Sequence, residues 1–156
     1  MTTTDPKVLH SRAGANERAT RGLQAALICV EKPATAAASL IGAPLLGKVL
    51  SVNGAYVCLI PLSGLASAIK VNAKATLATS TLTSAGPDEV FEFDPRTVDV
   101  ANAVVLTSGT GDGALTTTVL QTASLTLTGA MYARYTLTLG GGAGTATITA
   151  AEVQGL

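Results

Sequence analysis

The chain has few charged residues and almost no aromatic ones. Charged side chains make up 13% of its 156 residues, where about 25% is typical of soluble domains. Tryptophan is absent, and aromatic residues are 3% of the chain. A core without large rings gains less free energy per side chain, because each ring buries about 150–250 Å². Scarce charge and a formal net charge of zero favour association with other chains over solubility as a monomer.

Cysteine is also scarce, which excludes a disulfide framework. The chain has two cysteines, Cys29 and Cys58. Each lies in an apolar run, so we expect both to behave as small buried hydrophobic residues. A bridge between adjacent strands stays open as an alternative.

Long apolar runs are missing as well. The most hydrophobic span, residues 40–69, is interrupted by Pro44, Lys48, Pro61 and Gly64, so it holds no uncharged apolar helix of about 18 residues. Residues 1–6 lack the basic start and the apolar stretch of a secretory signal. We therefore expect a soluble protein without a membrane partner.

The residues needed for catalysis or metal binding are missing or isolated. His10 is the only histidine, which is too few for a zinc site or a Ser-His-acid triad. A phosphate loop requires a lysine after its glycines, and no lysine follows the glycine-rich stretch 109–113. Asp112 is the single acid in this stretch, and calcium needs six to eight oxygen ligands. We therefore predict that the chain is not an enzyme and that it has no cofactor or metal.

The densest group of charges is acidic and lies between residues 88 and 99. Glu89 and Glu92 are three residues apart, which in a strand places them on opposite faces. We interpret this segment as a solvated loop and strand edge rather than a two-carboxylate active site. Pairing with basic residues of another chain is the alternative. On that alternative the expected partner contacts are Asp88, Glu89, Glu92 and Asp94.

The chain divides into an N-terminal arm, residues 1–24, and a β-rich domain, residues 25–156. The arm is polar and basic, so we expect it to be flexible, with a short helix over 15–26 as an alternative. It has no aromatic residue for stacking on bases, which disfavours specific nucleic-acid binding. Its basic residues are the other expected partner contacts: Lys7, Arg12, Arg18 and Arg21.

From residue 25 on, short apolar or Thr-rich runs alternate with turn signals. About 8–10 short strands are expected, which predicts a single-domain β-sandwich or barrel, jelly-roll-like in style. Two hairpins are expected, one around Asn53-Gly54 and one around residues 140–144. Strands over 66–71 and 75–82 lead to a turn at 84–88. Residues 98–107 are expected to be a buried strand, 109–113 a flexible turn, and 132–139 a half-buried strand.

The chain combines a polar arm, Ala/Thr/Gly-rich strands and the stretch Thr136-Leu137-Thr138-Leu139-Gly140-Gly141-Gly142. In this combination it resembles small virion proteins of tailed bacteriophages. Head decoration (cement) proteins are the most similar in size and style. The resemblance implies a virion protein made in the host cytoplasm, often a trimer, docked on the major capsid protein or another virion protein. A tail-tube or fibre-associated subunit is the alternative. A β-sandwich carbohydrate-binding module is another, which the scarcity of aromatic platforms disfavours.

Overall fold

The structure, a computed structural model, describes residues 24–62, 66–91, 104–111 and 113–156. Regular structure in these ranges is almost entirely β: twelve strands and one 3-10 turn, η1 (Ala38–Leu40). The all-β class is therefore confirmed, with more strands than expected. The expected arm lies outside the described residues except for Gln24.

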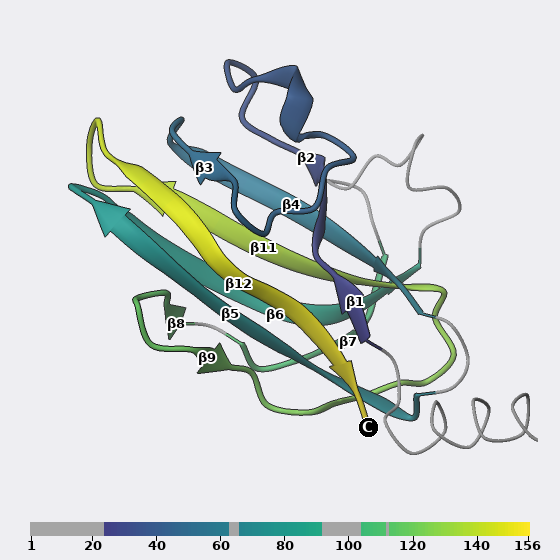
Figure 1. Cartoon of the computed structure of the whole chain (residues 1–156). Helices are drawn as coiled ribbons and strands as arrows, with labels where there is room; N and C mark the ends of the chain where they lie inside the picture. The colour runs from purple at the N-terminus through teal and green to yellow at the C-terminus, as the bar shows by residue number, and fades with distance from the viewer. Residues whose placement is uncertain (1–23, 63–65, 92–103, 112) are drawn as a thin grey trace, which may run out of the picture.

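The strands form two antiparallel sheets of six strands each. Sheet A has the order β1 (Gln24–Ala26), β12 (Thr145–Gly155), β5 (Ala68–Ala78), β10 (Leu125–Thr126), with β3 (Val49–Leu50) paired to β12 and β9 (Leu120–Gln121) paired to β5. Sheet B has the order β2 (Ile28–Glu31), β4 (Gly54–Pro61), β11 (Tyr132–Gly140), β6 (Thr81–Phe91), β7 (Val104–Ser108), with β8 (Gly113–Ala114) paired to β6. Figure 1 shows the long strands of the two sheets.

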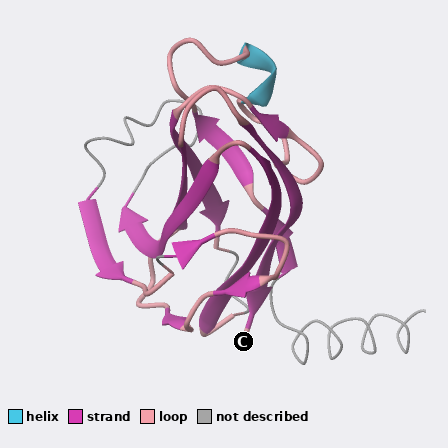
Figure 2. Ribbon diagram, turned by 90° about the vertical axis from the view of Figure 1, so that its left-hand side faces the viewer, coloured by secondary structure: helices cyan, strands magenta, loops and turns pink. Residues whose placement is uncertain are grey.

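The core lies between the two sheets, so the sandwich alternative is confirmed. In β11 every second residue is buried, from Ala133 to Leu139, as the alternation over 132–139 predicted. β5 contributes Ile69, Val71 and Ala73 from the opposite sheet. The loop that carries η1 closes one end of the sandwich (Figure 2).

Both expected hairpins are wrong, because each turn carries the chain from one sheet to the other. β3 pairs with β12 in sheet A, whereas β4 pairs with β2 and β11 in sheet B. A two-residue hairpin at Asn53-Gly54 would have put Leu50 and Tyr56 on opposite faces. The crossing lets both side chains point into the core, where both are fully buried. The second turn likewise joins β11 to β12, which lie in different sheets.

The turn expected at 84–88 is also wrong, because β6 continues through it. Asp88 pairs with Arg134 and Ala85 with Thr136, so Gly86 and Pro87 together face a single residue of β11. This is a β-bulge. Proline has no N–H to donate to a neighbouring strand, and a bulge is a position in a strand where that hydrogen bond is not needed. The strands expected over 66–71 and 75–82 are replaced by β5, which runs unbroken to Ala78.

Candidate interaction surface

Part of the outer face of sheet B presents small and β-branched side chains without charge. Strand register aligns two rows of three residues across its central strands: Val57, Thr136 and Ala85, then Ala55, Thr138 and Thr83. All six are partly or fully exposed, and we call them the sheet B face. Charged residues of the described strands of sheet B lie outside this set: Glu31, Asp88, Glu89 and Arg134. Glu31, the exposed register partner of Val57 on β2, and the Asp88–Arg134 pair border this set, so a partner centred on the six residues meets charge only at the margin.

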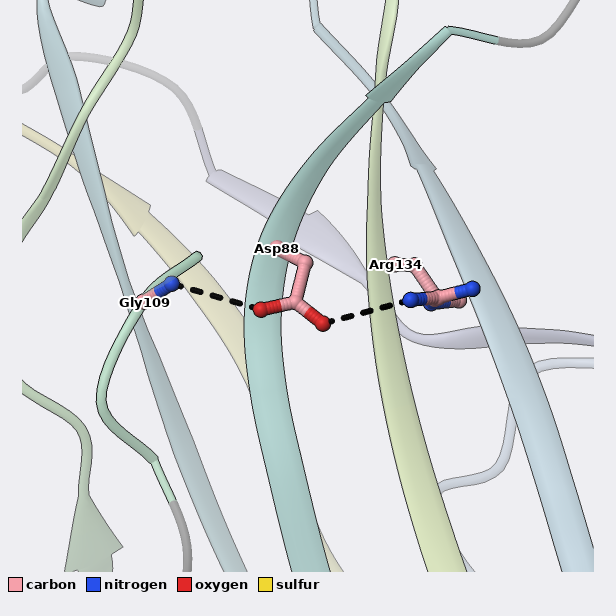
Figure 3. Close-up of polar contacts among 3 residues, drawn as sticks. All are labelled: Asp88, Gly109 and Arg134. Carbon is pink, nitrogen blue, oxygen red and sulfur yellow. Dashed lines mark hydrogen bonds and ion pairs between the residues drawn. The ribbon is translucent and has the colours of Figure 1, made fainter. Parts of the chain in front are cut away.

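Asp88 and Arg134 neutralise each other beside the sheet B face. An Arg134 nitrogen lies 3.4 Å from Asp88 Oδ2, and both side chains are 21% exposed. The other carboxylate oxygen of Asp88 accepts a hydrogen bond from the Gly109 N–H at 3.3 Å. Figure 3 shows Asp88 between these two partners. One exposed pair of this kind contributes little to stability, but it removes net charge from this side of the sheet.

Glu89 is buried, so the expected solvated strand edge is wrong at this residue. It pairs in register with buried Ala133 and therefore points into the sandwich. Its Oε1 accepts hydrogen bonds from the N–H groups of Thr128, Gly129 and Ala130 at 2.9, 3.1 and 2.8 Å. Its Oε2 accepts from the Thr128 N–H and hydroxyl. The carboxylate thus holds the turn between β10 and β11, and it offers a partner no exposed atom.

The hydrogen bonds at Glu89 outweigh the cost of burial. Burial by itself raises the pKa of the Glu89 carboxyl, but the bonds from Thr128, Ala130 and Gly129 favour its charged form. The hydrogen bonds have the larger combined effect, so the pKa of Glu89 lies below its ordinary value of 4.5. Glu89 is therefore an ionised structural group at neutral pH rather than a proton donor for catalysis.

The edge of sheet B exposes three consecutive aliphatic residues. β7 is the last strand in the order of the sheet, and Val104, Val105 and Leu106 are 58%, 40% and 49% exposed. The buried strand expected over 98–107 is therefore wrong for its described part. Register shifts by one residue between β6 and β7, so Leu106 has no paired residue on β6. Exposed apolar edges of this kind are typical places for contact with another chain.

The loop expected to be flexible is bound to β6. Ser84 Oγ donates to the Gly111 carbonyl at 2.6 Å, and the Ala123 N–H donates to the Thr110 carbonyl at 3.1 Å. A side chain on Gly111 would overlap the Gly86 carbonyl oxygen, so only glycine fits this contact. The glycines therefore serve close packing on the bulge of β6, and no bound ligand is needed to explain them.

The structure describes two of the eight expected contact residues, Asp88 and Glu89. Lys7, Arg12, Arg18 and Arg21 lie outside the described residues, as do Glu92 and Asp94. Asp88 is partly exposed and paired with Arg134, whereas Glu89 is buried. The sheet B face was missed, because the alternation of Thr136-Leu137-Thr138 indicates a strand and does not show which strands lie beside it.

Other features of the described part of the chain give no sign of a chemical site. Its His, Cys, Asp and Glu residues nowhere gather in groups of three that could hold a metal ion. An open hollow of about 610 Å³ lies on sheet A and is lined by residues such as Leu46, Asn72 and Glu152. Tyr56 and Tyr135 are buried in the core, so neither offers a platform for a sugar ring. No helix in the described ranges is long and apolar enough to cross a bilayer.

The chain matches no protein-family model and no curated protein.

Proposed function

We propose that this chain is a structural virion protein that decorates the head of a tailed bacteriophage as a homo-oligomer. The observation that carries the proposal is the uncharged sheet B face, together with the exposed aliphatic edge of β7, which pairs with a later part of β6. Surfaces of small side chains permit close packing between subunits without desolvating charges. The resemblance of the chain's composition to that of decoration proteins supports the same role.

Attachment at many equivalent positions fits such a surface. The sheet B face has no aromatic anchor among its six residues, so a single contact through it is weak. Several copies joined in an oligomer bind together, and avidity then raises the overall affinity without a strong individual site. We propose a trimer that docks on the major capsid protein.

Binding to undecorated heads tests this function. Purified chain is mixed with heads assembled from the major capsid protein of the same genome, and bound chain is measured after sedimentation. We expect saturable binding at a fixed number of copies per head. Absence of saturable binding would contradict the proposal, and assembly of the purified chain into tubes would favour a tail-tube subunit instead.

A charge placed on the sheet B face identifies the docking surface. Thr138→Lys puts an unpaired ammonium group on this face, and we expect at least about tenfold weaker binding to heads. Thr76→Lys is the matched control, because Thr76 is an exposed strand threonine on sheet A. Both variants should keep the thermal midpoint of the unmodified chain. Equal binding by the two variants would exclude the sheet B face as the docking surface.

A further inference from the structure

The fold places the two cysteines of the chain directly opposite each other. Cys29 lies on β2, at the edge of sheet B, and Cys58 lies on β4; the two are register partners. Both side chains are fully buried, and both are free thiols. Neither contributes to the proposed docking surface, so their pairing is a separate feature of the molecule.

The backbone hydrogen bonds show which kind of pair this is. The Cys29 N–H donates to the Ala43 carbonyl at 3.3 Å, and the Cys29 carbonyl accepts from the Gly42 N–H at 2.6 Å. Both backbone groups of Cys29 therefore point away from β4. Cys29 and Cys58 form a non-hydrogen-bonded pair, in which Cα atoms are about 4.5 Å apart and side chains are closest. That separation lies within the range of about 4.4–6.8 Å found across disulfides.

We propose that Cys29 and Cys58 are the site of a cross-strand disulfide that forms under oxidising conditions and ties β2 to β4. A small disulfide such as oxidised glutathione supplies the oxidant. The Cys29 thiolate attacks one glutathione sulfur and releases the first glutathione as a thiol. The Cys58 thiolate then attacks the Cys29 sulfur of the mixed disulfide and releases the second. Two protein thiols are oxidised to one disulfide, and the glutathione disulfide is reduced to two thiols that carry the two protons.

Access to the pair controls when it reacts. Burial raises the pKa of the Cys29 thiol and raises that of Cys58 well above its ordinary value, so little thiolate exists in the closed sandwich. Cys29 reacts first, because β2 has only four residues and can open locally when the segment 42–45, which hydrogen-bonds to its outer side, detaches. Its Sγ now donates to the Glu31 carbonyl at 3.0 Å, and formation of the bridge replaces this weak bond. Oxidation therefore occurs during folding or during opening of the edge.

Refolding the full chain in glutathione buffers tests the disulfide. In oxidised glutathione we expect an intact mass lower by two hydrogen atoms and a cross-linked peptide that contains both cysteines. The bridge should raise the thermal midpoint by roughly 5–15 °C, since it shortens the free chain of the unfolded state. Reduced glutathione should reverse both changes.

Single-cysteine variants give the matched controls. Cys29→Ser and Cys58→Ser should each end as a mixed disulfide with glutathione and show no rise in the thermal midpoint. The decisive measurement uses the unmodified chain, so it stands even if a variant fails to fold. Unbridged thiols or a stable glutathione adduct on the unmodified chain would overturn the proposal. A bridged form with a lower midpoint than the reduced form would overturn it too.

Discussion

At the scale of single residues, Glu89 joins two parts of the chain that are distant in sequence. Its carboxylate accepts hydrogen bonds from three successive N–H groups, those of Thr128, Gly129 and Ala130. We expect Glu89→Ala to lower the free energy of unfolding by about 1.5–3 kcal/mol, because the part-buried N–H groups of this turn lose a charged acceptor. Glu89→Gln keeps one acceptor oxygen and should cost less. Urea unfolding followed by circular dichroism measures both changes.

Asp88 supplies the matched control for this prediction. It is the neighbouring acid on β6, but its ion pair with Arg134 is partly exposed. Asp88→Asn should therefore change the free energy of unfolding by less than about 1 kcal/mol. A similar loss in Asp88→Asn and Glu89→Ala would show that burial and hydrogen bonding do not distinguish the two acids.

Glu89 also makes stability depend on acid pH. Its pKa in the folded chain lies below the ordinary value of 4.5, so the folded state holds its proton less tightly than the unfolded state. The stabilisation is fully present above the ordinary value and is lost as pH falls through the folded pKa. We expect the difference in stability between the unmodified chain and Glu89→Gln to be constant near neutral pH and to shrink below about pH 4.5. Urea midpoints measured from neutral to acid pH check this, and a difference that grows on acidification would refute it.

At the scale of elements, the bulge of β6 and the loop after β7 form one packed unit. Gly111 lies against the Gly86 carbonyl, and Ser84 binds the Gly111 carbonyl. We expect Gly111→Ala to push this loop off β6 and to cost about 2–3 kcal/mol of unfolding free energy. Thr110→Ala is the control, because Thr110 is exposed and its backbone bond to Ala123 is retained. Equal thermal midpoints for the two variants would contradict this packing.

The elements also show what the sequence could and could not predict. Alternation over 132–139 identified a half-buried strand, because burial of every second residue is a local pattern. Asn53-Gly54 was misleading, because a turn signal does not say whether the next strand stays in the same sheet. That choice depends on burying Leu50 and Tyr56 together. Gly86-Pro87 read as a turn for the same reason: a bulge is defined by the partner strand β11, which lies about fifty residues further along.

The candidate site was less predictable than the fold. The prediction from sequence rested on charged residues such as Glu89, but Glu89 is buried and stabilises a turn inside the fold. The sheet B face has no charge or motif to mark it, and it exists only because β4, β11 and β6 come into register. Residues that become neighbours only when strands pair are far apart in the sequence, so no short stretch of sequence contains them together. Alternating threonines were visible, but they indicated a strand rather than a shared surface.

At the scale of the whole molecule, salt dependence distinguishes the possible modes of association. Contacts through the sheet B face or the β7 edge are uncharged, so we expect the mass of the oligomer to be the same at low and high salt. Contacts between the basic arm and the acidic segment would instead weaken as salt screens them. Light scattering at both salt concentrations measures the mass. A monomer under both conditions would contradict the expected self-association.

The strand order of sheet A has a consequence for synthesis of the chain. β12 pairs with β1, β3 and β5, so the ribosome makes it after every strand that it joins. β1 and β3 therefore emerge with no partner, and the sandwich cannot close until residues 145–155 have been made. Contacts this distant in sequence also slow folding. Sheet B likewise waits for β11, which joins β4 to β6, so a newly made chain exposes its apolar strand residues to co-translational chaperones through most of its synthesis.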